Sequence, residues 1–400
     1  MEGDLIYTNK HLRPLSWLYG LGVGFRNFLF ETGVLKSHSY ATPVISVGNI
    51  TVGGTGKTPH VEYLIRLLKD KTNLAVLSRG YKRKSHGFVL ADDNSTMYDI
   101  GDEPFQMKQK FPDITVAVDK KRTRGISRLT SGAAGKDIDV IVLDDAFQHR
   151  YVKPGINILL VDYHRLIIYD ELLPSGRLRE PAGSKDRADI VIVTKCPPDI
   201  KPMDFRVLTK ALNLYPYQQL YFSTFEYGEL VPLGDLGGLG GLGSLESLAT
   251  LATLAPYHTL LLTGIASPEQ MRQDLERYAK DIRPLTFADH HQFKEKDIRL
   301  INETFSQLPS PKCIITTEKD AVRLRMVKGL SDEVLQHLYV LPIRIKLMLG
   351  QEEAFNKHII DYVRKNSRNS ILAKSKDDYK PKDSDYSGDR PRTISFRNNR

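Results

Sequence analysis

Short apolar segments alternate with amphipathic segments through the first half of the chain. Six of the apolar segments are rich in β-branched residues and bounded by Gly, Asp or Lys, at residues 43–48, 74–78, 114–118, 139–145, 157–162 and 189–195. Continuous apolar runs of this kind are typical of strands buried on both faces of a parallel sheet. Helical patterns such as residues 60–70 separate some of them. Repeated strand–helix units predict a doubly wound α/β domain over residues 41–222.

A second α/β pattern occupies the later part of the chain. An apolar segment at 259–265 precedes a helical segment at 267–279, and another strand-like segment begins the stretch 312–324. Before them lies a Gly-Leu stretch at 233–248, where dense glycine opposes both helix and strand. We therefore predict a smaller α/β domain over residues 223–363, with the Gly-Leu stretch as a loop or insert.

The N-terminal region, residues 1–40, contains an apolar and aromatic segment at 15–35 that Arg26 and Glu31 interrupt. A membrane-spanning helix needs about 20 nearly uninterrupted apolar residues. Two interpretations stay open for this segment: a helix lying in a membrane interface, and a helix packed on its own domain. The first residues show no basic region followed by an apolar run, so no signal peptide is predicted.

Composition restricts the class of protein. The chain has 400 residues, of which 41% are hydrophobic and 26% charged, and this is ordinary globular composition. Collagen, a polytopic membrane protein and a wholly disordered chain are excluded. With only two cysteines, Cys196 and Cys313, a disulfide framework and a four-thiolate zinc site are excluded as well.

The net charge of +9 first suggests a nucleic acid or an anionic membrane as partner. Residues 364–400 hold 11 basic and 5 acidic residues, with few apolar ones, and are expected to be a disordered tail. The remaining chain is nearly neutral. The charge distribution therefore favours an anionic lipid surface over nucleic acid as a partner.

The strongest chemical motif follows the first predicted strand. A Gly-rich turn ends in Gly56-Lys57-Thr58, and a helical pattern begins there. In this P-loop context, backbone N–H groups bind phosphates at a helix N-terminus, Lys57 would reach the β- and γ-phosphates of ATP, and Thr58 would hold Mg²⁺. Thr51 stands where the strict pattern has glycine, and a glycine turn without a ligand is the alternative. The predicted nucleotide contacts are Thr51, Val52, Gly53, Gly54, Thr55, Gly56, Lys57 and Thr58.

A second motif ends the apolar strand 139–145 in Asp144-Asp145. P-loop enzymes place a Mg²⁺-binding carboxylate at such a strand end. Adjacent residues of an extended chain point to opposite faces, so only one of the two would face the metal, and Asp144 is the one we favour. The alternative is a strand-end helix cap.

Three weaker clusters also follow predicted strands of the first domain. They are the basic stretch 78–84, the acidic turn 101–104 and the basic stretch 120–124. Taken singly, each is typical of a solvated loop or a cap. Ligands of open α/β sheets bind beyond the carboxyl ends of the strands, so together the clusters would surround an anionic acceptor. An acid among them could take a proton from a hydroxyl.

Seven motifs occur in one order along residues 44–324: VGNITVGGTGKTP, SRGYKRK, GDEP, LDDAFQHR, LLPSGRLREP, ADHHQF and TTEKDAVRL. Together they resemble the tetraacyldisaccharide 4′-kinase family, the lipid A 4′-kinases. Ala146 stands where that family usually has glycine. The resemblance implies transfer of the ATP γ-phosphate to the 4′-hydroxyl of a tetraacylated glucosamine disaccharide 1-phosphate. It also implies peripheral attachment to the cytoplasmic face of the bacterial inner membrane, which supports the interfacial interpretation of residues 15–35.

The resemblance also implies roles for single residues. Asp102 matches the acid that activates the sugar hydroxyl, and His290 matches a histidine that pairs with it, although the adjacent His291 leaves that choice open. Lys57 and Asp145 complete the predicted catalytic set. Further contacts to nucleotide or acceptor are predicted at Gln148, Arg79, Tyr81, Arg122, His149, Arg179 and Glu180.

Two rival classes of nucleotide-binding protein fit the P-loop less well. A membrane-associated partitioning ATPase carries a signature lysine where Val52 stands. A GTP-dependent switch reads guanine through Asn-Lys-x-Asp, and the matching position, Thr194-Lys195-Cys196-Pro197, lacks both Asn and Asp. A nucleic-acid-binding module would require positive charge along one face of the fold.

Overall fold

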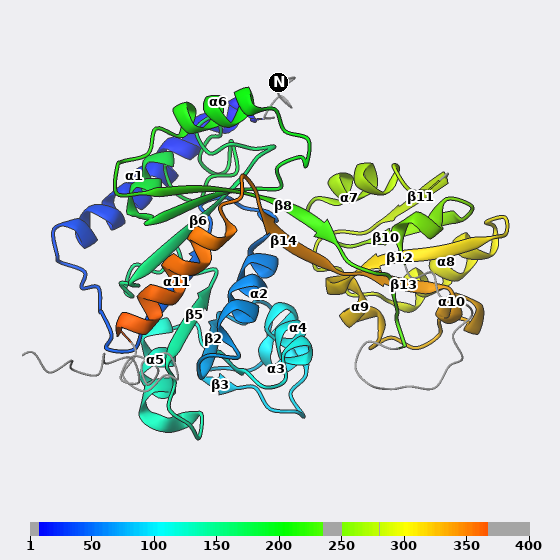
Figure 1. Ribbon diagram of the computed structural model, residues 1–400, viewed down its shortest axis with the longest axis horizontal. Coiled ribbons are helices and arrows are strands. Elements are labelled where there is room, and N and C mark those ends of the chain that lie inside the picture. The colour runs from blue at the N-terminus through cyan, green and yellow to red at the C-terminus, as the bar shows by residue number, and fades with distance from the viewer. Residues whose placement is uncertain (1–7, 235–249, 280, 367–400) are drawn as a thin grey trace, which may run out of the picture.

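The computed structural model describes residues 8–234, 250–279 and 281–366. Two β-sheets, each with helices packed on it, form a larger and a smaller lobe that lie side by side (Figure 1). Nearly all of the predicted Gly-Leu insert, residues 233–248, and of the predicted basic tail, residues 364–400, lies outside the described residues.

The larger lobe is built on a nine-stranded sheet, counted over the described residues, with the strand order β14-β8-β7-β6-β1-β5-β2-β4-β3. The strands from β8 to β4 are parallel, and the edge strands β14 and β3 run antiparallel to their neighbours. This confirms the predicted doubly wound sheet. The strands are β1 (Val44–Gly48), β2 (Leu74–Ser78), β3 (Val89–Leu90), β4 (Thr115–Val118), β5 (Val140–Asp144), β6 (Ile156–Asp162), β7 (Ile190–Thr194), β8 (Gln219–Tyr227) and β14 (Ile343–Leu347).

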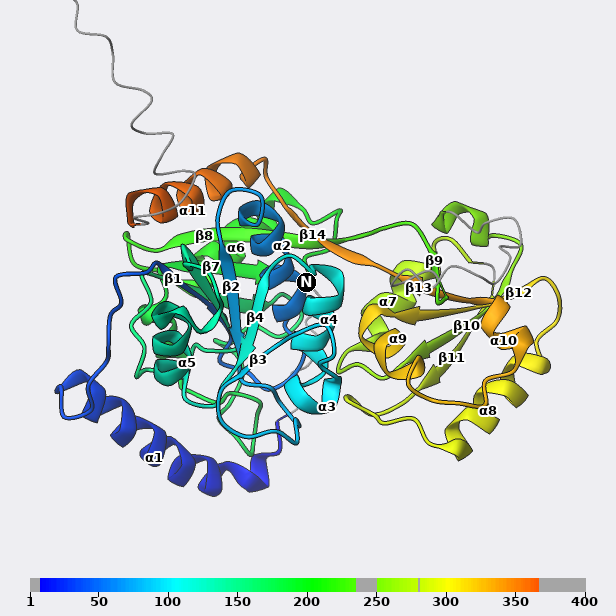
Figure 2. The ribbon, with the colours of Figure 1, turned by 90° about the horizontal axis from the view of Figure 1, so that it is seen from below.

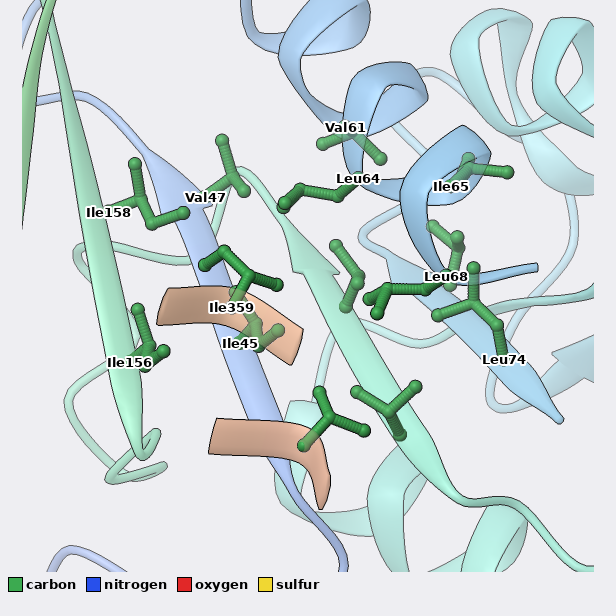
Figure 3. Packing of buried hydrophobic residues seen from close by; sticks show 14 of the residues in the cluster. Ile45, Val47, Val61, Leu64, Ile65, Leu68, Leu74, Ile156, Ile158 and Ile359 are labelled. Atoms are coloured by element: carbon green, nitrogen blue, oxygen red, sulfur yellow. The ribbon is translucent and has the colours of Figure 1, made fainter. Parts of the chain in front are cut away.

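Helices cover both faces of this sheet because successive strand residues point to opposite faces. Ile45 and Val47 of β1 pack with α2 and α11 (Figure 3). Val44 joins the core beneath α5 on the other face. The helices of this lobe are α2 (Lys57–Leu68), α3 (Met97–Ile100), α4 (Asp102–Lys110), α5 (Arg122–Arg128), α6 (Pro202–Leu212) and α11 (Glu352–Asn366).

The smaller lobe has a five-stranded sheet, counted over the described residues, in the order β11-β10-β12-β13-β9. Its strands are β9 (Val231–Pro232), β10 (His258–Thr263), β11 (Asp281–Thr286), β12 (Lys312–Thr317) and β13 (Leu338–Leu341). The helices packed on it are α7 (Pro268–Leu275), α8 (Glu295–Ser306), α9 (Glu318–Leu324) and α10 (Asp332–Gln336). A second α/β unit was predicted here, and the strand–helix alternation agrees with that prediction.

The sheets divide the chain differently from the predicted boundaries at 222 and 363. Strand β8 belongs to the larger sheet and continues to Tyr227, and β14 pairs with it antiparallel, so two adjacent strands connect the lobes (Figure 2). Helix α11 then buries Phe355 and Ile359 in the core of the larger lobe. Residues 343–366 therefore return to the larger lobe because their apolar face completes its core.

The N-terminal segment forms a helix, α1 (Arg13–Glu31), at the periphery of the larger lobe (Figure 2). The Ser16 hydroxyl donates to the Leu172 carbonyl at 2.9 Å, and the Tyr19 hydroxyl donates to the Arg179 carbonyl at 2.9 Å. The opposite face is exposed and carries a stripe of large apolar side chains, which we call the α1 stripe: Trp17, Leu18, Leu21, Phe25 and Phe28. Among the described residues, no helix is long and apolar enough to cross a membrane.

Candidate active site

The loop between β1 and α2 has the backbone form of the predicted phosphate-binding turn. It leaves the sheet at Gly48 and enters α2 at Lys57, with Gly53 and Gly56 at positive φ angles of 115° and 80°. These left-handed conformations suit glycine and turn successive backbone N–H groups toward the helix N-terminus. All eight predicted nucleotide contacts, residues 51–58, lie on this turn and the first residues of α2.

The departure at Thr51 has a structural reason. Thr51 does not adopt a left-handed φ and forms an isolated β-bridge with Leu178, so the position tolerates a side chain. The buried Asn49 amide donates to the hydroxyls of Thr51 at 3.2 Å and Thr55 at 2.9 Å. These side chains brace the turn from within, which glycine at residue 51 could not do.

Asp144 and Asp145, at the end of β5, have opposite environments. The fully buried Asp144 accepts a hydrogen bond from the Ser78 hydroxyl at 2.9 Å on Oδ2, while its Oδ1 is buried without a partner. Burial, with the charges of Glu103 and Asp145, raises the pKa of Asp144 to about 7. Asp145 faces the P-loop lysine, and the Lys57 Nζ lies 3.6 Å from its Oδ1. Burial would raise the pKa of Asp145, but the Lys57 charge and Arg179 lower it overall.

Asp102 and His290 meet between the two lobes. Asp102 is the first residue of α4 in the larger lobe, and His290 lies on the loop between β11 and α8 of the smaller lobe. The His290 Nδ1 lies 3.1 Å from Asp102 Oδ2, and the Lys319 ammonium lies 3.1 Å from His290 Nε2. Because an ammonium group can only donate, Nε2 accepts, and Nδ1 carries the hydrogen that His290 donates to Asp102.

His291 points elsewhere. Its Nε2 lies 2.9 Å from Asp297, and its ring stacks on Phe287 within the smaller lobe. Of the two adjacent histidines, the structure therefore brings the favoured one, His290, to Asp102.

The predicted basic contacts gather near the carboxyl end of β5. Arg122 is only 2% exposed, and it donates to the carbonyl oxygens of Asp119 at 2.7 Å and Asp144 at 3.0 Å, while its Nε is buried without a partner. The His149 Nε2 is likewise buried without a partner. Burial, with the positive charges of Arg122, Arg26 and Arg79, lowers the pKa of His149 to about 4. Two unpartnered groups among positive charges fit an anionic ligand.

The other predicted contacts differ in what they touch. Tyr81 is 59% exposed, with its ring 5.3 Å from that of His290. Gln148 donates to the Asn49 carbonyl at 2.5 Å, and Arg179 donates to Asp145 at 3.3 Å, so both reach the P-loop region. Glu180 is buried, with its Oε2 paired with Arg187 at 2.5 Å and its Oε1 buried without a hydrogen-bond partner.

The sequence of this chain is similar to a family of known kinases. Residues 8–364 match the model of the family described as Tetraacyldisaccharide-1-P 4′-kinase (LpxK). The Tetraacyldisaccharide 4′-kinase of Phocaeicola vulgatus is 59% identical over 372 residues, covering 92% of this chain and 99% of the relative. The chain belongs to this kinase family. The enzyme of the same name from Bacteroides thetaiotaomicron is 52% identical over 376 residues, covering 93% of this chain and 98% of that one.

A solved kinase of the family has the same fold. The LpxK of Aquifex aeolicus, described as an "apo" form in complex with ATP, is 28% identical in sequence. The structural match covers 88% of this chain and 98% of that one, with a TM-score of 0.64. In the present structure a cleft runs beside the P-loop. It is lined by Thr51–Thr55 together with Asp162, His164, Arg165, Arg177 and, from the smaller lobe, Ser267.

Three side chains that contact the predicted site residues were not themselves predicted as site residues. Ser78 holds Asp144, Lys319 contacts His290, and Arg323 contacts Asp102 at 2.9 Å. The motif TTEKDAVRL contained a signal, because Lys319 and Arg323 are four residues apart and share one face of a helix. In the same motif, Thr317 caps α9 by accepting a hydrogen bond from the Asp320 N–H.

The strand-end aspartate fits a divalent cation. Among the described residues, no group of three or more His, Cys, Asp or Glu side chains is placed to hold a metal ion. Mg²⁺ needs no such group, because it is usually held by one or two carboxylates plus substrate phosphates. The unpartnered Oδ1 of Asp144, at the carboxyl end of the strand beside β1, is a donor of the required kind.

Proposed function

We propose that this protein is an ATP-dependent kinase that phosphorylates the 4′-hydroxyl of a tetraacyldisaccharide 1-phosphate, giving the bisphosphorylated lipid A precursor. Its family and its relatives' names support the reaction. The observation that carries the proposal is that the predicted nucleotide-binding residues and the predicted base lie near the same edge of the larger sheet. Lys57 begins the helix after β1, and Asp144 ends β5. Glu103, which follows Asp102 in the chain, is close enough to Asp144 for its negative charge to raise the pKa of Asp144.

The phosphates of ATP would lie on the turn of residues 51–58. Backbone N–H groups bind the chain of phosphates, and Lys57 neutralises the charge that grows on the γ-phosphate. In the structure the Lys57 ammonium contacts Asp145, so that carboxylate would hold the lysine in the site before ATP binds.

Asp144 and Thr58 would hold Mg²⁺ against the phosphates. When bound, Mg²⁺ supplies positive charge that stabilises the leaving diphosphate. The pKa of Asp144 is raised to about 7, as expected for a buried carboxylate beside other negative charges. Ser78 fixes Oδ2 of this carboxylate and leaves Oδ1 for the metal.

The acceptor hydroxyl would approach Asp102. As the 4′-oxygen bonds to the γ-phosphorus, the bond from phosphorus to the bridging oxygen of ADP breaks, and the hydroxyl proton passes to Asp102. Burial would raise the pKa of Asp102, but His290 and Arg323 lower it below its ordinary value, so the carboxylate is ionised at neutral pH. Such a base is weak, which suits a loose transition state in which the proton leaves late.

The acidic acceptor also needs a site for its own phosphate. The unpartnered Arg122 Nε and His149 Nε2, with Arg79 beside them, form a positively charged environment for that 1-phosphate or for the nucleotide. The neutral His149, whose pKa is lowered to about 4, would donate a hydrogen bond and add no charge.

The acyl chains of such a substrate lie in a membrane, and α1 offers a surface for it. The α1 stripe occupies one helical face, with exposures between 57% and 73%. Apolar and aromatic side chains on one helical face are typical of helices that lie in a membrane interface. We propose peripheral attachment through α1 to an anionic membrane, at the cytoplasmic face of the inner membrane, where ATP is available.

The experiment is transfer of labelled γ-phosphate from ATP to a tetraacyldisaccharide 1-phosphate in mixed micelles. Wild-type protein should form a doubly phosphorylated lipid, and Lys57→Ala should lower kcat by at least about 10³-fold because it removes positive charge from the transition state. Lys210→Ala, an exposed lysine of α6, is the matched control and should keep full activity. Wild-type hydrolysis of ATP with no labelled lipid would contradict the proposal.

A further inference from the structure

Helices α4 and α9, from different lobes, face each other through three ion pairs. Glu318 meets Lys110 at 2.5 Å, Lys319 meets Glu103 at 3.6 Å, and Arg323 meets Asp102 at 2.9 Å. Only the last of these pairs includes the residue proposed as the base. It joins residues 221 positions apart in the chain, so it exists only while the lobes lie together.

Arg323 is fixed from behind. It is 3% exposed as a residue, and its Nη1 donates to Asp320 Oδ1 at 3.1 Å and to the Gly264 carbonyl at 3.3 Å. The fully buried Asp320 is held in turn by the Thr317 hydroxyl at 2.7 Å and the Gly264 N–H at 2.9 Å. Nε and Nη2 of the guanidinium remain, and both point to Asp102.

The hydrogen bonds to the Asp102 carboxylate all end on one oxygen. Arg323 Nε at 3.1 Å, Arg323 Nη2 at 2.9 Å and His290 Nδ1 at 3.1 Å all contact Oδ2. Within residues 8–234, 250–279 and 281–366, no hydrogen bond ends on Oδ1. Three donors on Oδ2 fix the rotation of the carboxylate and leave Oδ1 free to accept from a hydroxyl.

We propose that Arg323 is a positioning residue for phosphoryl transfer, which binds Oδ2 of Asp102 so that Oδ1 is presented to the acceptor hydroxyl. This role rests on the proposed kinase function and goes beyond the pairing of Asp102 with His290. It makes the base competent only when α9 of the smaller lobe contacts α4 of the larger one. Catalysis would thereby be coupled to the approach of the two lobes.

The charged groups around Asp102 predict how its pKa changes when Arg323 is replaced. Burial favours the neutral acid, whereas the hydrogen bond from His290 and the charge of Arg323 favour the carboxylate, and the net effect lowers the pKa. The titratable and charged groups around it are Glu103 on α4, Lys319, Asp320 and Arg323 on α9, Asp289 and His290 on the loop before α8, and Tyr81 after β2. Without the Arg323 charge the pKa of Asp102 rises, so the acid limb of the activity profile moves to higher pH.

The test compares Arg323→Met, Arg323→Lys and the wild type in the labelled-ATP assay between pH 5 and 9. Arg323→Met should lower kcat by about 10²-fold, because an unoriented base loses its contribution, and should leave the KM for ATP within about 3-fold. Its acid limb should lie at higher pH than that of the wild type. Arg325→Met, beside the end of α9 with its guanidinium on the Leu233 carbonyl, is the control and should match the wild type.

Arg323→Lys separates charge from geometry and protects the test against misfolding, because it keeps a buried cation beside Asp320. It should retain the wild-type acid limb, since the charge remains, while kcat falls about 10-fold because a lysine cannot donate as a two-pronged fork. Wild-type kcat in a folded Arg323→Met, or an unshifted acid limb in that variant, would overturn the positioning role. A wild-type protein that transfers no phosphate to the lipid would instead overturn the proposed function.

Discussion

The α1 stripe predicts that the triple variant Leu18→Ser, Leu21→Ser, Phe25→Ser binds membranes more weakly than the wild type. The three side chains are 66%, 71% and 65% exposed, and full burial of such a side chain stabilises by about 1.5–3 kcal/mol. Two-thirds of that value over three side chains gives about 3–6 kcal/mol of membrane affinity. Because each 1.4 kcal/mol is tenfold, the partition coefficient should fall by at least about 100-fold.

The assay is sedimentation with vesicles of phosphatidylethanolamine and phosphatidylglycerol. The control is Met203→Ser, Leu300→Ser, Leu335→Ser, which removes exposed apolar side chains from α6, α8 and α10. The control should bind as the wild type does, and the α1 variant should unfold at the wild-type temperature, since its three replaced side chains are mostly exposed. Equal vesicle binding by the α1 variant and the wild type would refute the assignment of this face to the membrane.

Two further predictions concern the folded core. Phe355→Ala should lower the free energy of unfolding by about 3–5 kcal/mol, because the ring of this α11 residue is 2% exposed in the core of the larger lobe, and urea unfolding measures the loss. An unchanged urea midpoint would show that α11 does not pack there in solution. Burial raises the pKa of Cys196 to about 12 and that of Cys313 to about 11, so neither thiol should react with a disulfide reagent at pH 8 until the protein is unfolded. Rapid modification of the folded protein would contradict that burial.

The central part of the fold could be predicted from local pattern, and its edges could not. The strands β1, β2, β4, β5, β6 and β7 coincide with apolar runs because each is buried on both faces. The edge strand β14 alternates exposed and buried residues, and its partner β8 lies more than a hundred residues earlier in the chain. Helix α11 returns to the larger lobe because its apolar face covers part of that lobe's core. The uncovered part of the core exists only once the sheet has assembled, so the local sequence pattern does not reveal it.

Some residues of the candidate site could likewise be predicted from the sequence, and others could not. The P-loop turn could be predicted because its strand, turn and helix are contiguous in sequence, and the position of Asp144 at a strand end could be predicted because it follows an apolar run. His290 and His291 are adjacent on one loop, and the contacts of His291 with Asp297 and Phe287, which separate the two rings, form only in the folded protein. Arg323 stood in a recognised motif, but its partner lies in the other lobe, so spacing alone could not reveal the contact.

We propose that Asp102 activates the 4′-hydroxyl for attack on ATP bound at the P-loop. The most direct measurement is single-turnover transfer by wild type and Asp102→Asn, with the product phosphate located by ³¹P NMR. We expect a new phosphate on the 4′-oxygen, a rate at least about 10²-fold lower for Asp102→Asn, and unchanged ATP binding by that variant. The exposed Asp93→Asn should match the wild type. Wild-type transfer by Asp102→Asn, or a phosphate at another position, would contradict it.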